Sequence, residues 1–589
     1  MSENVRTLVS NFQKSPVVEL EQDLDSWRGW RQIIAELRSH LSTIEKKKIV
    51  IAVDLYPGNS EDDFTSILRE GLEPELLVSA QRVMLPAEEL SKLLASDVTD
   101  DPIFGKLTRF KLGELWDQKS LKQVRSKVDK IEEGLILTLG VGASLITEPD
   151  VIVYGDLARW EIQKRFRANK ACNLGLDNSQ QKTSDQYKRA YFVDWRLGDR
   201  HKRSLFDKWQ YYIDCNSVDD PKMISGESFQ QVMDHVVSRP FSVVPFFDPG
   251  PWGGQWMRDV CGLDKEAPNY AWCFNCVPEE NSLLVKVGSE TIEMPSLNVV
   301  LSRPTELLGP KVHGRFGAEF PIRFDFLDTV EGGNLSLQVH PLTEYIQEEF
   351  GVPYTQDESY YILDADPDSK VYLGLKEECK PSEVLEDLEK AQDGEDGFDA
   401  DKYIESWPVK KHDHFLIPAG TIHCSGAGSM VLEVSATPYI FTFKLWDWGR
   451  LGLDGLPRPI NISRGKDVIQ WDRKTQWTKE NLVNQIEEIA SGDGWREERT
   501  GLHERGFSET RRHWFSKDTL HYTENNLHVI CLVEGREAIV ESPDAKFEPF
   551  IVHYGETFII PAQIDSYRIR PHGESLGKEC GTLKAYVRG

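Results

Sequence analysis

The chain reads Asn334-Leu-Ser-Leu-Gln-Val-His-Pro341, then Asp357-Glu-Ser-Tyr-Tyr-Ile362, and then Phe415-Leu-Ile-Pro-Ala-Gly-Thr-Ile-His423, all within residues 332–450. Strand residues alternate sides, so Gln338 and His340 project from the same face of one strand. Glu358 opens a second strand, and His423 follows a Pro-Ala-Gly turn after a third. Two imidazoles, one carboxylate and one amide oxygen from adjacent strands can hold one divalent ion.

The order of these three segments carries more information than any single one of them. A lone histidine is usually a surface residue or a satisfied core residue. Three such segments in this order, with Pro-x-Gly-x-x-His after an apolar strand, form the pattern of a cupin, a small β-barrel whose mouth holds a metal. The alternative is a barrel without a metal. The nitrogen and oxygen donors suit Zn²⁺, although manganese, iron or cobalt fit the same set.

The stretch from about residue 240 to residue 589 resembles the bacterial type I mannose-6-phosphate isomerases, which are zinc-dependent aldose–ketose isomerases. Similar landmarks lie on both sides of the metal pattern: Pro251-Trp-Gly-Gly254, Arg258, Phe320-Pro321, Phe326-Leu-Asp328, Leu432-Glu433 and Lys444-Leu-Trp-Asp-Trp-Gly-Arg450. The resemblance implies that Gln338, His340, Glu358 and His423 take the family's metal-ligand places.

The same resemblance suggests further site residues. An aldose–ketose isomerase needs a base, stabilisation of an enediolate and a cation for the phosphate. Glu433, which matches the family's Leu-Glu, is the candidate base or a structural carboxylate. Trp252 is either a wall of the sugar pocket or a core residue. The remaining candidates are cations or outer-surface charges (Lys444, Arg450 and Arg315) and one substrate-contacting amide (Gln356).

Three positions depart from the family's pattern. Asp325 and Gln356 stand where the family has lysines, and Lys444 stands where it has an arginine. Two cations are lost, and one changes from a planar fork to a point charge. The metal set is complete while the substrate set is not. The sequence therefore leaves two hypotheses: a sugar-phosphate isomerase, by default of mannose-6-phosphate and fructose-6-phosphate, or a regulatory protein that binds a sugar without turnover.

The first 230 residues alternate strands and helices, which predicts a mostly parallel sheet with helices on both faces. A strand at residues 48–54 enters the loop Pro57-Gly-Asn-Ser60, where a phosphate cradle would lie. Acidic residues 61–63 occupy the places where a phosphate loop needs a Lys and a Ser or Thr. The order loosely resembles a P-loop nucleoside kinase with a degenerate phosphate loop, and the missing lysine argues against a working kinase.

Four smaller features complete the prediction. Arg159, Lys164, Arg165 and Arg167 form either a remnant anion site or the solvated face of a helix that begins at Leu157. Short strands are expected at residues 191–194 and 211–214. Residues 381–401 are acidic and predict a largely helical insertion between barrel strands. An amphipathic helix is expected at residues 480–489.

We therefore predict an α+β multidomain protein, with C-terminal double-cupin β-barrels of the jelly-roll type and an N-terminal α/β parallel-sheet domain. The expected domains are residues 1–230, a metal-bearing cupin at 240–470, and residues 471–589 with one helix and a second barrel. The last ninety residues repeat the strand–turn rhythm but have no QxH pair, and Ala562-Gln563 replaces the glycine and ligand region. We expect this second barrel to be metal-free.

Composition limits the partners and the compartment. A net charge of −27 and a pI near 5.0 argue against nucleic acid binding. No run approaches the roughly 18–20 apolar residues of a membrane span, and the N-terminus lacks an apolar signal core. Nine cysteines without scaffold spacing fit a reducing cytoplasm. The expected partner is a small sugar phosphate, and the oligomeric state stays open.

Overall fold

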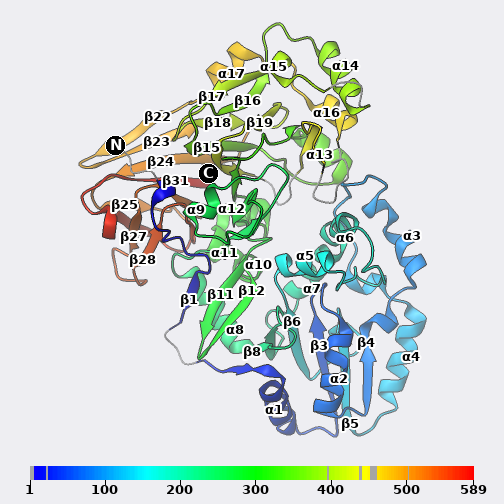
Figure 1. The fold of residues 1–589 in the computed structure, drawn as a ribbon. Helices are drawn as coiled ribbons and strands as arrows, with labels where there is room; N and C mark the ends of the chain where they lie inside the picture. The colour runs from blue at the N-terminus through cyan, green and yellow to red at the C-terminus, as the bar shows by residue number, and fades with distance from the viewer. Residues whose placement is uncertain are drawn as a thin grey trace.

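The computed structural model describes residues 5–20, 24–393, 397–436, 441–451, 460–501, 503 and 505–588. Three bodies of secondary structure follow one another along this part of the chain (Figure 1). We call them the α/β region, the first sheet pair and the second sheet pair. The protein therefore has a mixed helix and sheet architecture with several sheets. The described residues contain no helix that is both long and apolar enough to cross a membrane.

The α/β region is built on a seven-stranded sheet of order β2-β8-β7-β6-β3-β5-β4. Its strands are β2 (Ser26–Arg28), β3 (Lys48–Leu55), β4 (Leu76–Ser79), β5 (Gly134–Gly140), β6 (Val151–Asp156), β7 (Tyr211–Asp214) and β8 (Lys222–Ser225). Strands β4, β5, β3, β6 and β7 pair in parallel, and β8 and β2 are antiparallel. The expected mostly parallel sheet is confirmed.

Eight α-helices accompany this sheet in the described residues: α1 (Gly29–Ser42), α2 (Glu61–Leu72), α3 (Ala87–Val98), α4 (Gln118–Asp129), α5 (Arg159–Arg167), α6 (Thr183–Arg189), α7 (Trp195–Arg203) and α8 (Gly226–Val237). Helix α2 begins where Ser60 caps the backbone NH of Asp62, and its acidic first turn suits the positive end of the helix dipole. Just before it, a Cβ on Gly58 would lie 2.8 Å from Ile162 of α5. The loop thus packs directly on α5, where a phosphate loop would hold its ligand.

The strand predicted at residues 191–194 is wrong. These residues belong to a π-helical turn, η5 (Ala190–Asp194), which joins α6 to α7 without a break. Tyr191, Phe192 and Val193 are all buried at 0–1% exposure. An aromatic and β-branched run buried on every side has high β-propensity, but here tertiary packing imposes a helix.

The first sheet pair carries the metal pattern. Its six-stranded sheet has the order β18-β15-β20-β13-β10-β9, and its five-stranded sheet has the order β17-β16-β19-β14-β21. The first sheet contains β9 (Phe246–Asp248), β10 (Trp272–Cys276), β13 (Arg323–Asp328), β15 (Glu358–Ala365), β18 (His414–Ile417) and β20 (Ser429–Ser435). The second contains β14 (Leu337–Val339), β16 (Lys370–Leu375), β17 (Ile404–Pro408), β19 (His423–Ser425) and β21 (Phe443–Trp446).

Helices surround this sheet pair: α9 (Trp256–Val260), α10 (Leu297–Ser302), α11 (Pro304–Leu308), α12 (Pro310–Phe316), α13 (Thr343–Phe350) and α16 (Ile462–Val468). The helical insertion is confirmed, because α14 (Pro381–Gln392) and α15 (Ala400–Tyr403) lie between β16 and β17. Residues 394–396 of that prediction lie outside the described residues.

The second sheet pair has a six-stranded sheet of order β22-β23-β24-β31-β26-β29 and a four-stranded sheet of order β25-β30-β27-β28. The strands are β22 (Glu487–Gly492), β23 (Trp495–Gly501), β24 (Ser508–Phe515), β25 (Thr519–Tyr522), β26 (His528–Glu534), β27 (Glu537–Glu541), β28 (Phe550–His553), β29 (Thr557–Ile560), β30 (Ser566–Pro571) and β31 (Cys580–Val587). Its core includes Phe515, Ile530 and Phe558.

The helix predicted at residues 480–489 is wrong. Helix α17 (Thr475–Asn481) ends early, and residues 487–492 form β22, which pairs with β23. Every residue of β22 is exposed, so burial did not select its conformation. Backbone pairing to β23 at the sheet edge outweighs the local helix propensity of this Glu-rich segment.

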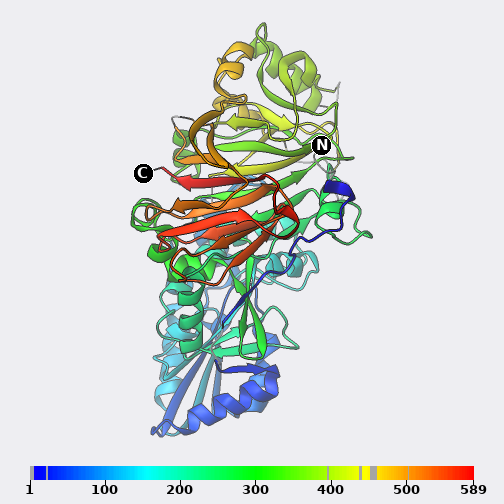
Figure 2. The same cartoon turned by 90° about the vertical axis from the view of Figure 1, so that its left-hand side faces the viewer.

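The N-terminal segment ties the two sheet pairs together. In Figure 2 it runs as a dark blue coil along the sheet pairs. Arg6 forms an ion pair with Asp364 of β15 at 2.7 Å, and the backbone NH of Gln13 donates to Glu556 of the second pair at 2.6 Å. The segment then becomes β1 (Val17–Glu19) in a small sheet with β11 (Ser282–Val287) and β12 (Glu290–Pro295).

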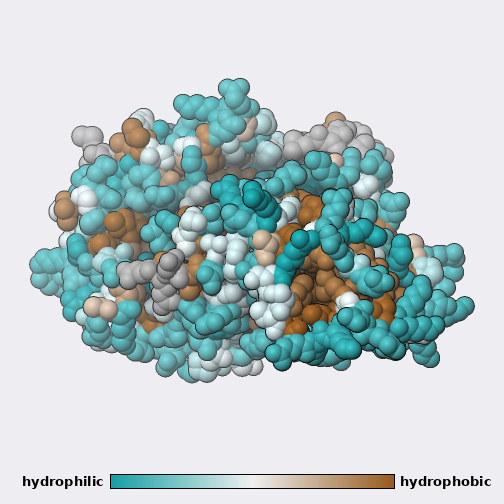
Figure 3. All heavy atoms as spheres, turned by 90° about the horizontal axis from the view of Figure 1, so that it is seen from below, coloured by the Kyte–Doolittle hydropathy of each residue, from teal (hydrophilic) through white to brown (hydrophobic). Residues whose placement is uncertain are grey.

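The surface matches the composition. Seen from below, hydrophilic residues cover most of the molecule, with hydrophobic areas between them (Figure 3). This distribution is that expected of a chain with net charge −27, because charged side chains remain in water.

Candidate metal centre

The predicted ligands come from both sheets of the first pair. Strand β14 lies between β19 and β21, and Gln338 of β14 is in register with His423 of β19. His340 follows at the end of β14, on the same face as Gln338. Glu358 is the first residue of β15 in the facing sheet. Strand alternation therefore brings Gln338, His340 and His423 opposite Glu358.

The four side chains are buried and in contact. Glu358 Oε2 lies 3.1 Å from His340 Nε2, and Glu358 Oε1 lies 2.9 Å from His423 Nε2. The Gln338 amide nitrogen lies 3.2 Å from His423 Nε2. Both histidines are 0% exposed. One ligand atom from each of His340, Glu358 and His423 fits within 4.8 Å of the others, and no other group of His, Cys, Asp or Glu among the described residues meets this criterion.

Backbone carbonyls fix the orientation of both imidazoles. His340 Nδ1 donates to the carbonyl of Phe441 at 3.0 Å, and His423 Nδ1 donates to the carbonyl of Thr421 at 2.9 Å. A carbonyl only accepts, so each Nδ1 carries the proton and each Nε2 turns its lone pair toward Glu358. His340 Nε2 and Glu358 Oε1 have no hydrogen-bond partner. A cation between them would stabilise the Nε2 lone pairs of the neutral imidazoles and the carboxylate oxygens, and a divalent metal fits this donor set.

Burial and the neighbouring charges shift the pKa values of the candidate ligands in opposite directions. Burial raises the pKa of Glu358, but His340 and His423 reverse this and hold the pKa well below its usual range. Burial lowers the pKa of His340, but the charge of Glu358 raises it above its ordinary value. Both shifts favour the charged carboxylate beside a cation.

A row of carboxylates continues from the ligand set. Asp325 of β13 is in register with Glu433 of β20, which is in register with Tyr360 of β15. Burial raises the pKa of Asp325 to about 6. Burial and the neighbouring Glu358 raise the pKa of Glu433 well above its ordinary value. Gln356 donates its amide to Glu358 at 2.9 Å and to Glu433 at 3.4 Å. Two of the three departures from the family pattern, Asp325 and Gln356, thus lie on the site itself.

Of the other predicted site residues, Lys444 lies on β21 and Arg450 follows that strand, whereas Trp252 and Arg315 come from other elements. Lys444 is in register with Gln338 on β14, so it lies beside the ligand strand. Arg450 forms an ion pair with Asp447 at 2.7 Å. Trp252 is 1% exposed and packs edge-on against Trp272 with ring centroids 4.7 Å apart, which favours the core alternative. Arg315 is exposed on α12, and its guanidinium lies over the ring of Phe316 at 5.1 Å.

Sequence reasoning missed Arg323. It lies two residues before Asp325 on β13 and therefore on the same face. Ser435 of β20 lies between it and Glu358 in one register row. Arg323 is 2% exposed, its Nη2 lies 3.9 Å from Asp325 Oδ2, and its Nε and Nη1 have no hydrogen-bond partner. The alternation of Arg323-Phe-Asp325 was the signal that could have found this buried cation.

The sequence left two alternatives for the cations of α5, a remnant anion site or a solvated helix face, and the structure shows where each cation lies. Arg159 is 2% exposed and bonds Asp199 at 2.6 Å, so it does not belong to a solvated helix face. Arg165 pairs with Glu161 at 3.1 Å, and Arg167 pairs with Asp248 at 2.8 Å across to β9. Lys164 lies over the ring of Trp160 at 3.7 Å. These cations serve protein contacts.

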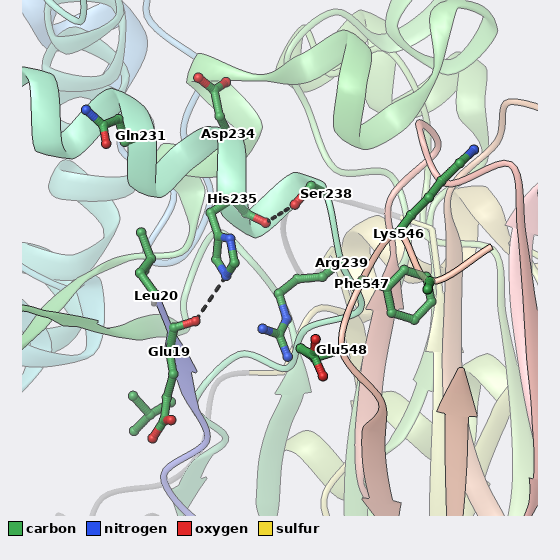
Figure 4. Close-up of a pocket in the computed structure, with 12 residues that line it drawn as sticks. Glu19, Leu20, Gln231, Asp234, His235, Ser238, Arg239, Lys546, Phe547 and Glu548 are labelled. Carbon is green, nitrogen blue, oxygen red and sulfur yellow. Dashed lines mark hydrogen bonds between the residues drawn. The ribbon is translucent and has the colours of Figure 1, made fainter. Parts of the chain in front are cut away.

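A large cleft lies away from the candidate metal centre, beside α8. A cleft of about 900 Å³ separates α8 from residues 545–548 of the second sheet pair (Figure 4). His235 Nε2 bonds the carbonyl of Glu19 at 3.0 Å, and Arg239 points toward Glu548. Cations and acids alternate around this cleft, and they do not converge on one point. The side chains of His340, Glu358 and His423, in contrast, meet at one point.

Comparison with known proteins finds a similarity to one protein family and to several curated proteins. The family described as "Domain of unknown function (DUF8485)" matches residues 29–238. The mannose-6-phosphate isomerase of Streptococcus mutans is 29% identical over 220 residues, which are 37% of this chain and 64% of that protein. The chain thus spans less than two thirds of that relative's length. The mannose-6-phosphate isomerase ManA of Bacillus subtilis is 25% identical over 235 residues, 40% of this chain and 69% of that protein.

Among solved structures, the mannose 6-phosphate isomerase from Bacillus subtilis matches with a TM-score of 0.48 and 19% identity, covering 59% of this chain and 99% of that one. The similarity of this chain to mannose-6-phosphate isomerases is therefore of low identity and partial coverage. The kinase-like resemblance of the N-terminal half finds no support in these comparisons.

Proposed function

We propose that this protein is a metal-dependent aldose–ketose isomerase of a sugar phosphate, with mannose-6-phosphate and fructose-6-phosphate as the default pair. One observation carries the proposal: two imidazoles with their Nδ1 protons fixed by backbone carbonyls turn Nε2 toward both oxygens of the buried Glu358. The names of the relatives, mannose-6-phosphate isomerases, support the reaction class.

The architecture fits the same proposal. We take the two sheet pairs as two cupin barrels of the jelly-roll type, the first metal-bearing and the second metal-free. The corresponding domains are residues 1–230, 240–470 and 471–589. Antiparallel strands in two facing sheets enclose a mouth where side chains from both sheets meet, as Gln338 and Glu358 do.

The ligand set assigns the metal's place. Gln338, His340, Glu358 and His423 would hold Zn²⁺ or another divalent transition metal. When bound, such an ion supplies positive charge that stabilises negative charge developing on the sugar oxygens. Gln356 holds Glu358 through its amide, which leaves the carboxylate one fixed orientation toward the imidazoles.

Glu433 is the proposed base. It is 7% exposed, faces the interior beside Tyr360 and lies within hydrogen-bond reach of Gln356. In its ionised form it would take a proton from the carbon next to the carbonyl and return it to the adjacent carbon through an enediolate, while the substrate's hydroxyl proton passes to the former carbonyl oxygen. Arg323 would donate the N–H groups of its two unpartnered nitrogens, Nε and Nη1, to substrate oxygens. Lys444 and Arg450 are the proposed cations on the β21 side, and Trp252 and Arg315 would act at most as walls of the pocket.

A regulatory protein that binds a sugar without turnover is the second candidate. Asp325 favours it, because a carboxylate stands where the relatives' pattern has a cation. Thermal stabilisation by a hexose phosphate without product formation would select this candidate.

The test is a metal analysis of the purified protein combined with a coupled assay for interconversion of mannose-6-phosphate and fructose-6-phosphate. We expect about one transition metal per chain and turnover that EDTA abolishes. A fully metal-loaded protein that converts no member of a hexose phosphate panel would reject the isomerase.

A further inference from the structure

The α/β region packs against the first sheet pair immediately behind the metal ligands. We propose that it is a positioning part of the metal site: it fixes the backbone that orients His340 and the acidic turn that faces Arg323. Its effect on catalysis rests on the proposed isomerase function, whereas its effect on metal affinity does not.

Phe441 is the first link. Its carbonyl accepts the Nδ1 proton of His340 at 3.0 Å, and its ring is 0% exposed. That ring stacks on Phe104 with centroids 5.3 Å apart and an interplanar angle of 14°, and it lies 6.3 Å from Phe192. Phe104 and Phe192 both belong to the α/β region, and Phe350 of α13 closes the group at 4.9 Å. The carbonyl that sets the His340 tautomer is therefore held by packing across the interface.

The α/β region presents these two rings rigidly. Phe104 is 1% exposed and Phe192 is 0% exposed. The backbone NH of Thr108 donates to the carbonyl of Phe192 at 2.9 Å, which joins the two segments. A Cβ on Gly105 would lie 2.9 Å from the Phe192 ring and 2.6 Å from the carbonyl oxygen of Asp97, so the close approach requires glycine there. A shift of either ring would be transmitted to Phe441.

Glu280, in the turn after β10, is the second link. Its Oε2 accepts from Gln163 of α5 at 2.8 Å, and its Oε1 accepts from Tyr187 of α6 at 3.2 Å. Burial raises the pKa of Glu280, while the charges of Arg159 and Arg323 lower it. Burial also raises the pKa of the neighbouring Glu279, to about 7, although the charge of Arg323 lowers it. Two side chains of the α/β region thus hold this acidic turn, and the turn lies beside Arg323 because Cys276, which precedes it, pairs with Phe324 of β13.

The α/β region's own ligand position is filled. Ligands of parallel sheets bind at the carboxyl ends of the strands. There, Asp54 of β3 accepts from Ser144 and from His201 at 2.8 Å. Asp156 of β6 accepts from Lys202 at 3.0 Å, and Lys202 also bonds Asn298 of α10 at 2.9 Å. Side chains satisfy both carboxylates, and one of these contacts already reaches the first sheet pair. This supports a positioning role for the region.

The first experiment compares Phe104→Leu with Phe64→Leu. Phe64 is equally buried at 1% exposure, belongs to α2 and packs on Trp30 with centroids 5.5 Å apart. The affinity of each full-length protein for Zn²⁺ is measured by chelator competition. We expect about a tenfold loss for Phe104→Leu, the size usual when the hydrogen-bond partner of a metal-bound histidine is disturbed, and less than about twofold for Phe64→Leu. Equal affinities would overturn the proposal.

The second experiment compares Tyr187→Phe with Tyr211→Phe. Each tyrosine donates to a glutamate, Tyr211 to Glu36 at 2.7 Å within the α/β region. For Tyr187→Phe we expect KM for the sugar phosphate to rise a few-fold with kcat and Zn²⁺ affinity unchanged, and for Tyr211→Phe neither to change. An unaltered KM in Tyr187→Phe would overturn the second link. A parent protein that binds Zn²⁺ without turnover, but loses affinity in Phe104→Leu, would reject the isomerase and support the positioning role.

Discussion

The two sheet pairs both bury histidines, and they use them differently. In the first pair, His340 and His423 meet at Glu358, with each Nδ1 fixed by a backbone carbonyl. In the second pair, buried His513 and half-buried His521 lie with ring centroids 4.5 Å apart, and the Nδ1 of buried His528 bonds the Tyr567 hydroxyl at 3.1 Å. No backbone carbonyl fixes His513, whose two ring nitrogens have no hydrogen-bond partner.

The charges around the histidines account for the difference. Burial lowers the pKa of His340, but Glu358 raises it. Burial, together with the nearby cation of Lys584, lowers the pKa of His513 to about 3. Burial and nearby cations also hold the pKa values of His521 and His528 well below their ordinary range. A buried carboxylate and fixed imidazole tautomers thus distinguish the candidate metal site from the other histidine cluster, whereas the number of histidines does not.

The largest test of this comparison is His340→Ala against His513→Ala. Loss of a direct ligand should weaken Zn²⁺ binding by more than about 100-fold, because disturbing an outer partner alone costs 10–100-fold. Isomerase turnover should disappear with the metal. Elemental analysis and the coupled assay measure both effects. His513→Ala should keep the metal content of the parent, and loss of metal in that variant would erase the distinction between the two sheet pairs.

Metal removal tests the same contrast through stability. A ligand present at about 1,000 times its Kd stabilises the folded state by roughly 4 kcal/mol. Treatment with EDTA should therefore lower the melting temperature, and added Zn²⁺ should restore it. His340→Ala should melt at the same temperature with and without EDTA, because its site is already disabled. An EDTA effect of full size in that variant would place the stabilising metal elsewhere.

Arg323→Met against Arg315→Met sharpens the account of the substrate end. A hydrogen bond to a charged group contributes about 1.5–3 kcal/mol, so losing the contacts of Arg323 should raise KM for the sugar phosphate about 10–100-fold. Arg315 is exposed, and its replacement should leave KM nearly unchanged. Unphosphorylated mannose serves as the comparison substrate. A similar KM increase for both sugars would assign Arg323 to the hydroxyl oxygens instead of the phosphate.

The metal pattern was predictable because its rules are local. Alternation along β14 places Gln338 and His340 on one face, and the Pro-Ala-Gly turn delivers His423 beside Gln338. The role of Arg323 was harder to see. Its acidic neighbours Glu279 and Glu280 lie in the turn after β10 and not on β13. Gln163, 117 residues earlier in the chain, donates to Glu280. Such contacts depend on how the α/β region docks, which no periodicity in the sequence records.

The fold shows the same limit. The parallel sheet and the helical insertion follow from clear periodic patterns, and the structure has them. The predictions for residues 191–194 and 487–489 are wrong because neighbouring elements decide the conformation of both segments. The first segment is enclosed by other elements and continues a helix, and the second pairs with β23 at a sheet edge. In both places tertiary contacts outweigh local propensity.

The last prediction concerns the second sheet pair alone. The pKa of His513 is about 3 in the folded protein and near 6.5 when exposed, so the unfolded chain binds the proton first as the pH falls. The stabilisation is complete above pH 6.5 and is lost progressively below it, by about 2 kcal/mol at pH 5 for this residue. His513→Phe, which can stack on Phe515 as the imidazole does, should lose about 2 kcal/mol less between pH 7 and pH 5 in urea titrations. If the variant and the parent lose equal stability over this range, His513 is accessible to protons, and the charge contrast between the two histidine clusters fails.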